Sequence, residues 1–144
     1  MNNTDNSPTD QNVLNGSCLC GVIKYQITGP LKNVLNCHCS MCRKAHGAAF
    51  RTRAAVRSSD FTWLTGEELT TSYESSKGEF RIFCSVCGSN LITEFERDKN
   101  WIGFPLGTLD DDPKVKAECH VMVGSKAPWH DITDNLKQWL EFPD

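Results

Sequence analysis

Eight cysteines in a chain of 144 residues are the feature that most restricts what this sequence can fold into. Seven of them fall in three tight groups, and the eighth, Cys119, stands alone. The groups are Cys18-Leu19-Cys20-Gly21, Cys37-His38-Cys39-Ser40-Met41-Cys42 and Cys84-Ser85-Val86-Cys87-Gly88. Sulfur ligands of zinc must converge at roughly 2.3 Å from the ion, and a C-x-x-C turn followed by glycine achieves this. The spacing therefore predicts at least one zinc site.

Disulfides are the alternative use of so many cysteines. Residues 1–15 contain no basic segment followed by an apolar run, so we expect no secretory signal. No stretch approaches the roughly 20 apolar residues that span a bilayer. We therefore expect a cytoplasmic protein, and the reducing cytosol keeps thiols free for metal ligation.

The charge of the chain restricts its partners. The formal net charge is −3, and no cluster of five or more Lys and Arg residues occurs. Binding to nucleic acid or to an anionic membrane would need such a basic patch. We expect neither partner, and the sequence does not fix the oligomeric state.

The pattern of apolar residues predicts a mainly β fold. Residues 1–15 have little to bury, so we expect a disordered N-terminal tail before a single domain over 16–144. Ile23, Tyr25 and Ile27 alternate with polar residues, as in a half-buried strand. Many short strands and little helix are typical of a β-rich domain of antiparallel strands with one or two short helices. Strands are expected over 22–27, 48–56, 61–64, 69–73, 80–83, 91–95, 101–104 and 117–123, and helices over 40–45 and 134–140.

The two C-x-C pairs are restricted in where they can lie. A regular strand does not bring the two sulfurs of a C-x-C pair together on one ion. We therefore expect both pairs, Cys18/Cys20 and Cys37/Cys39, at strand ends or turns, where their sulfurs can converge.

Spacing alone leaves the grouping of the ligands open. A sequential grouping would place the first four cysteines, Cys18, Cys20, Cys37 and Cys39, on one ion. The other grouping combines the outer pairs, Cys18/Cys20 and Cys84/Cys87, and leaves Cys37, Cys39 and Cys42 as a triad. Four cysteines close a structural zinc site, whereas three protein ligands leave a position open, as in catalytic zinc sites.

Four motifs, in this order, carry a resemblance to a known family. The runs GSCLCG, CHCSMCRKAHGAAF, FCSVCGSNL and HVMVGSKAPW resemble those of the glutathione-dependent formaldehyde-activating enzymes, which have an Mss4-like zinc fold. The similarity runs from about Gly16 to Phe142. It implies the outer-pair grouping, with Cys18, Cys20, Cys84 and Cys87 on a structural zinc and Cys37, Cys39 and Cys42 on an active-site zinc.

The resemblance also implies a function. It predicts a carbon–sulfur lyase-type enzyme that acts on a glutathione or small-thiol adduct of an aldehyde, such as S-hydroxymethylglutathione. Glutathione would then be a co-substrate, and the partners would be small-molecule thiols and aldehydes. The alternative from a different class is a non-catalytic zinc module that binds thiol compounds or a protein partner.

Several residues near the motifs are candidates for a role in the site. His120 is a candidate catalytic residue, and Lys126 and Arg43 are candidates for binding a carboxylate of glutathione. His38 lies between two expected ligands, where its direction disfavours ligation. Cys119 is expected to pack as a small apolar residue.

Overall fold

The computed structural model describes residues 13–143, and it confirms a mainly β, Mss4-like fold. The strands are β1 (Leu14–Ser17), β2 (Lys24–Ile27), β3 (Lys32–Cys37), β4 (Arg51–Arg57), β5 (Phe61–Thr65), β6 (Thr70–Ser76), β7 (Glu79–Cys84), β8 (Asn90–Phe95), β9 (Trp101–Pro105), β10 (Cys119–Val121) and β11 (Lys137–Gln138). The α-helix of the described residues is α2 (Ser40–His46), and the 3-10 helices are η1 (Ser58–Asp60), η2 (Glu67–Leu69), η3 (Leu106–Thr108) and η4 (Val123–Ser125). No helix within residues 13–143 is long and apolar enough to cross a membrane.

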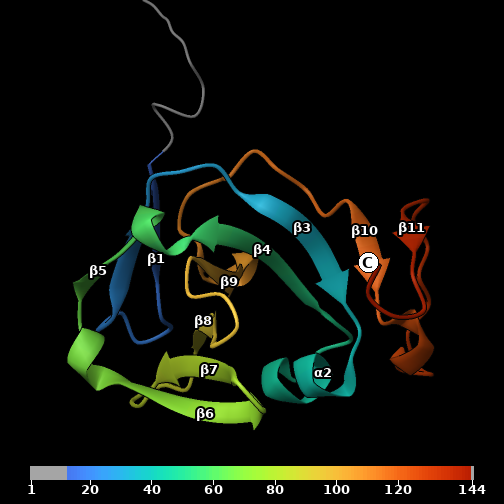
Figure 1. Ribbon diagram of the computed structural model, residues 1–144, viewed down its shortest axis with the longest axis horizontal. Helices are drawn as coiled ribbons and strands as arrows, with labels where there is room; N and C mark the ends of the chain where they lie inside the picture. The colour runs from blue at the N-terminus through green and yellow to red at the C-terminus, as the bar shows by residue number, and fades with distance from the viewer. Residues whose placement is uncertain (1–12, 144) are drawn as a thin grey trace, which may run out of the picture.

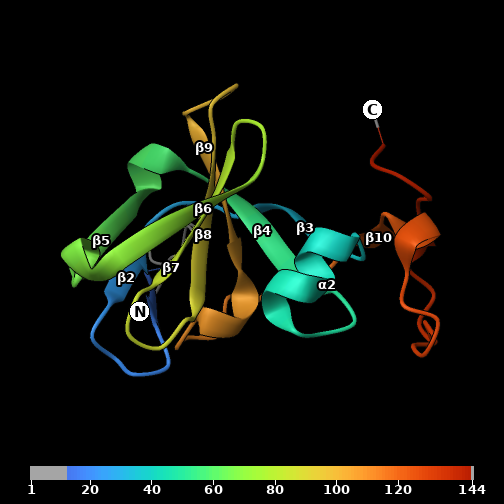
Figure 2. The same ribbon diagram turned by 90° about the horizontal axis from the view of Figure 1, so that it is seen from below.

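The strands form two sheets. The smaller has the order β1-β2-β5, and the larger has the order β11-β10-β3-β4-β9-β8-β7-β6. Pairing is antiparallel except at β10, which runs parallel to both β3 and β11. Figure 1 shows β4 arching over β9 and β8, with β7 and β6 below them and α2 beside the far end of β4. Seen from below, β10 and the C-terminal residues lie beyond α2, away from the small sheet (Figure 2).

The main core lies between the two sheets. The inward face predicted for the segment 22–27, which contains β2, is confirmed, since Ile23, Tyr25 and Ile27 are all fully buried. They belong to one apolar cluster with Leu91 and Phe104 of the large sheet. The hydroxyl of Tyr25 forms a hydrogen bond of 2.7 Å with the Thr108 hydroxyl, so this buried polar group is satisfied.

The first strand begins earlier than the expected domain boundary at residue 16. Strand β1 starts at Leu14, which is buried, and Asn15 pairs with Gln26 of β2. A single apolar side chain and the backbone partners offered by β2 are sufficient to extend the strand. The rest of the predicted tail, residues 1–12, lies outside the described residues.

The prediction of a helix over 134–140 is wrong. This segment is irregular and contains only the two-residue strand β11, which pairs with β10. The backbone N–H of Trp139 donates to the His120 carbonyl at 2.9 Å, so the edge of β10 supplies the hydrogen bonds that a helix would have made internally. The short helix expected over 40–45 is confirmed by α2.

The close approach of β1 to β2 yields a test of the core. A Cβ added at Gly16 would overlap the ring of Tyr25, which is fully buried and cannot move aside. We expect Gly16→Ala to lower the free energy of unfolding by about 2 kcal/mol, measured by urea denaturation. Gly107→Ala is the matched control, since an added Cβ there meets nothing within 4 Å. Equal stability of the two variants would contradict this packing.

Candidate metal centres

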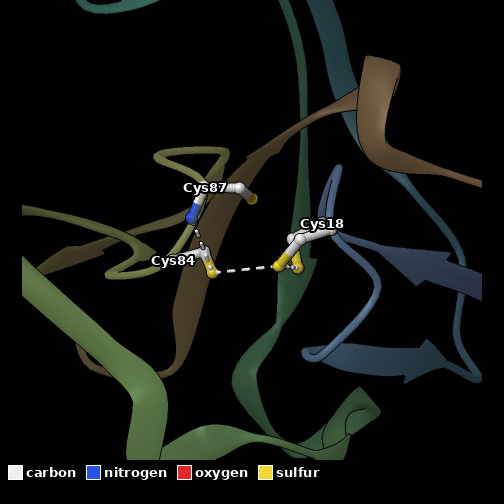
Figure 3. Close-up of side chains that lie close together, drawn as sticks. Cys18, Cys84 and Cys87 are labelled. Atoms are coloured by element: carbon white, nitrogen blue, oxygen red, sulfur yellow. Dashed lines mark hydrogen bonds between the residues drawn. The ribbon is translucent and has the colours of Figure 1, made fainter.

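The structure brings the outer cysteine pairs together. Cys18 and Cys20 follow β1, Cys84 ends β7, and Cys87 lies in the turn before β8. The four Sγ atoms all lie within 4.8 Å of one another. Figure 3 shows Cys18 on one side and Cys84 and Cys87 on the other, with their sulfurs turned toward one another. The sequential grouping of the first four cysteines is therefore not the one that the fold produces.

Tight turns aim these sulfurs inward. Gly21 and Gly88, which follow the two pairs, adopt φ values of 83° and 84°, a left-handed conformation that glycine adopts without steric cost. The Gly88 N–H donates to the Cys84 carbonyl at 2.8 Å and closes the second turn. The backbone N–H groups of Val86 and Cys87 point at the Cys84 sulfur at 3.4 and 3.5 Å. Both turns thus direct the sulfurs of their cysteines toward one place.

The spacing of the four sulfurs fits a tetrahedral ion. Sulfurs at the corners of a tetrahedron of radius about 2.3 Å are about 3.8 Å apart. The Sγ atoms of Cys18 and Cys20 are 3.6 Å apart, and those of Cys20 and Cys84 are 3.9 Å apart. A hydrogen bond with Ser89 lowers the pKa of Cys87 to about 5. These four residues could hold a metal ion, and their donor set suits zinc.

The second cluster consists of Cys37, Cys39 and Cys42, whose Sγ atoms also lie within 4.8 Å of one another. Cys37 is the last residue of β3, Cys39 is the N-cap of α2, and Cys42 lies in the first turn of the helix. The N-cap sulfur accepts from the Cys42 N–H at 3.3 Å. Both C-x-C pairs thus lie at a strand end or turn, as the sequence predicts. This cluster offers three sulfurs, one fewer than a closed site.

Positive groups surround Cys42. The neighbouring Cys37 and Cys39 side chains hold the pKa of Cys42 below its ordinary value, and the Arg81 guanidinium, 3.6 Å from Sγ, acts in the same direction. Arg51 is 7% exposed, and burial lowers its pKa to about 10. A sulfur in such surroundings is suited to remain a thiolate, the form that binds metals.

A buried chain of hydrogen bonds runs beside the three-cysteine cluster. Nε2 of His38 lies 2.8 Å from Nδ1 of His120, and Nε2 of His120 lies 3.0 Å from a carboxylate oxygen of Asp134. His38 and His120 are almost fully buried, and burial lowers the pKa of His38 to about 4. The hydrogen bond from His120 lowers the pKa of Asp134. The hydrogen bond at Nε2 therefore holds the His38 ring toward His120.

The direction of each hydrogen bond follows from the carboxylate. An ionised Asp134 only accepts, so Nε2 of His120 carries the proton. Nδ1 of a neutral His120 then accepts from Nε2 of His38. The remaining nitrogen, Nδ1 of His38, is left with a free lone pair, and it has no partner within residues 13–143.

Three further residues discussed in the sequence analysis, Lys126, Arg43 and Cys119, have different surroundings. The Lys126 ammonium donates to the backbone carbonyls of Ala127 and His130. Arg43 lies in α2, and its Nε is buried without a partner among the described residues. Cys119 belongs to neither cluster and packs, half-buried, against the apolar cluster around Cys37 and Val121.

Sequence reasoning missed three residues at the site: Arg51, Arg81 and Asp134. Arg51 and Arg81 lie in strands, where exposed arginines are common, and no local signal marks Arg51 as buried. Asp134 begins the segment 134–140 that was expected to be helical, although it follows the HVMVGSKAPW motif by only a few residues. A count of charged residues in otherwise apolar strands would have singled out Arg81 within EFRIFC.

Comparisons with known proteins bear on the family of the chain. The family model for "Glutathione-dependent formaldehyde-activating enzyme" matches residues 13–125. A protein of Halomonas elongata named "Putative glutathione-dependent formaldehyde-activating enzyme" is 30% identical over 128 residues, which cover 83% of this chain and 81% of that protein. The chain therefore belongs to the family of glutathione-dependent formaldehyde-activating enzymes. A crystal structure of a Rhodobacter sphaeroides protein shares the fold, with a TM-score of 0.55, 24% identity and coverage of 68% of this chain and 89% of that one.

The histidine chain predicts defined tautomers. Both His38 and His120 should carry their proton on Nε2 at neutral pH, as observed in long-range ¹H–¹⁵N correlation spectra of the imidazole rings. Asp134→Asn should shift the ring nitrogens of both histidines, because it changes the carboxylate that fixes the chain. Asp131→Asn is the control, since this exposed side chain makes no hydrogen bond within residues 13–143. A proton on Nδ1 of His38 in the wild type would show that the chain runs in the other direction.

Proposed function

We propose that this protein is a zinc-dependent carbon–sulfur lyase-type enzyme that acts on the adduct of glutathione, or a similar small thiol, with an aldehyde. One observation carries the proposal: the fold separates seven cysteines into a complete set of four and an incomplete set of three. Membership of the family supports glutathione as the thiol and formaldehyde as the aldehyde. A cytoplasmic location, where glutathione is abundant and thiols stay reduced, accords with the free cysteines.

The two clusters have different proposed roles. Cys18, Cys20, Cys84 and Cys87 would hold a zinc ion with no open position, which is the pattern of a structural site. Cys37, Cys39 and Cys42 would hold a second zinc ion. That ion, when bound, supplies a coordination position at which a substrate thiol is held as its thiolate.

The reaction requires one proton to move. In the synthetic direction, the glutathione sulfur forms a bond with the carbonyl carbon of formaldehyde, and the carbonyl oxygen gains the proton that the thiol loses. In the reverse direction, the carbon–sulfur bond of S-hydroxymethylglutathione breaks, and the hydroxyl proton returns to sulfur. A group that accepts and returns this proton must lie within reach of the oxygen.

We assign this proton to the histidine chain. Nδ1 of His38 has a free lone pair, and His120 with Asp134 holds the ring in the tautomer that leaves it free. Asp134 stabilises the positive charge that forms when His38 takes up a proton, as a carboxylate does for a histidine base. His120, predicted as a catalytic residue, therefore acts through His38 in this proposal and is a positioning residue.

Arg43 and Lys126 differ as candidates for binding glutathione. The Lys126 ammonium is already occupied by two backbone carbonyls, whereas Nε of Arg43 has no partner among the described residues. Arg43 also directly follows Cys42 on α2. We therefore propose Arg43 as the contact to a glutathione carboxylate and assign Lys126 to holding the segment after β10.

The activity is tested by the exchange of ¹³C-formaldehyde with glutathione at equilibrium, measured by NMR exchange spectroscopy. The wild type should accelerate exchange, Cys39→Ser should abolish the acceleration, and His120→Asn should reduce it by about a hundredfold. Cys119→Ala, outside both clusters, should retain full activity.

The zinc content of each variant is measured in parallel. A wild type that holds two zinc ions but leaves the exchange rate unchanged would contradict the proposal and favour the non-catalytic zinc module. Equal activity of Cys39→Ser and Cys119→Ala would contradict the role of the three-cysteine cluster.

A further inference from the structure

Two arginines are buried beside the three-cysteine cluster without a carboxylate partner. Arg51 on β4 is 7% exposed, and Arg81 on β7 is 8% exposed. The ion pairs within residues 13–143 are His120–Asp134, Arg97–Glu79 and Lys114–Asp112, and none of these includes either buried arginine. Burying a guanidinium is costly unless an anion or several acceptors lie beside it. Their presence therefore requires a source of negative charge.

The register of the large sheet explains how both side chains reach the same place. Arg81 pairs with Thr93, and Thr93 pairs with Gly103 of β9, so these positions form one line across the sheet. A Cβ at Gly103 would stand 3.8 Å from Nη2 of Arg51. Because Gly103 has no side chain, Arg51 extends across β9 from one side while Arg81 occupies the other end of the line.

The sulfur of Cys42 is the anion that Arg81 contacts, and the charge of Arg51 acts on the same sulfur. Nη2 of Arg81 lies 3.6 Å from it, while Nε of Arg81 donates to the Ser75 hydroxyl at 3.1 Å. Three thiolates and a Zn²⁺ ion would carry a formal charge of −3 + 2 = −1, and the two guanidinium groups add +2. The whole centre would then carry +1, so a fourth ligand with one negative charge would neutralise it.

Two of the unpartnered polar atoms point to the same kind of ligand. Within residues 13–143, the buried side-chain nitrogens and oxygens without a hydrogen-bond partner are His38 Nδ1, Arg43 Nε, His46 Nε2 and Arg51 Nε. All four belong to the segment from the end of β3 to the start of β4, which carries the cluster. The two arginine nitrogens can only donate, so they require acceptors.

We infer that Arg51 and Arg81 fix the charge of the three-cysteine centre so that its fourth ligand is an anion rather than a neutral molecule. This inference rests on the proposed second metal site and goes beyond it, because it names the residues that select the ligand. A trithiolate centre without these arginines would repel a further thiolate. The two arginines thus act as specificity-determining residues through charge, and the substrate class they select is an anionic sulfur ligand.

The test uses protein fully loaded with Co²⁺, whose absorption reports ligands at the metal. Thiocyanate is the anionic probe and imidazole, at about pH 8, is the neutral one. Arg51→Gln and Arg81→Gln should each weaken thiocyanate binding by about tenfold or more, because each removes a unit charge within about 10 Å of the ligand at an effective dielectric constant of about 20. Imidazole binding should change by less than about twofold, and Arg81→Lys should restore most of the thiocyanate affinity.

Two controls separate charge from folding. Arg97→Gln removes the same charge from an exposed residue that follows β8, and it should leave the affinity for both probes unchanged. The absorption of Co²⁺ at the four-cysteine cluster reports that each variant is folded.

The outcomes distinguish this inference from the proposed function. A second Co²⁺ that binds normally, with thiocyanate affinity equal in the wild type and both glutamine variants, would overturn the inference alone. A parallel loss of imidazole and thiocyanate affinity would overturn it too, because it would indicate a general structural role. Binding of only one Co²⁺ per wild-type chain would overturn the proposed second metal site and this inference with it.

Discussion

The convergence of four sulfurs from two turns, more than sixty residues apart in sequence, is the constraint on which the rest of the structure depends. Cys20 and Cys84 are separated by 64 residues, yet their sulfurs lie 3.9 Å apart. One turn follows the first strand of the small sheet, and the other joins β7 to β8 of the large sheet. A shared ion would hold the two sheets together at the edge of the core that they enclose. Structural zinc in small domains contributes on the order of 10 kcal/mol to folding.

The first cluster also positions the second. Strand β7 ends in Cys84, which belongs to the four-cysteine cluster, and the same strand carries Arg81, which contacts Cys42 of the other cluster. On the opposite side, β10 places His120 beside Asn36 of β3, one residue before Cys37. The three-cysteine cluster is thus contacted by residues of both β7 and β10, an arrangement suited to a site that must keep its ligands in place.

Much of this could be predicted from the sequence because cysteine spacing and apolar alternation are local signals. Ile23, Tyr25 and Ile27 alternate, and β2 is where they predict it. Strand β3 was missed because its residues from Val34 to Cys37 are all buried and therefore do not alternate. The segment 134–140 has helical spacing of apolar residues, but the edge of β10 offered stronger backbone partners than an isolated short helix has.

In the candidate site, too, local sequence signals predict some features and long-range pairing decides the others. The cysteines could be found from their spacing, whereas their grouping depended on a family resemblance until the fold was known. Arg51, Arg81 and Asp134 reach the site through strand register and chain reversal, and no local pattern predicts that these three residues meet there. Long-range pairing decides which charges surround a metal centre, and it is the part of a fold that a single sequence specifies least directly.

The central claim is that seven cysteines bind two zinc ions, four on one and three on the other. X-ray absorption at the zinc edge, combined with elemental analysis of protein purified without chelators, tests it most directly. The account predicts two zinc ions per chain with sulfur neighbours at about 2.3 Å, seven sulfurs in all, and one lighter or exchangeable ligand. Cys39→Ser should leave one zinc ion with four sulfur neighbours. One zinc ion in both proteins, or a shell dominated by nitrogen or oxygen, would contradict it.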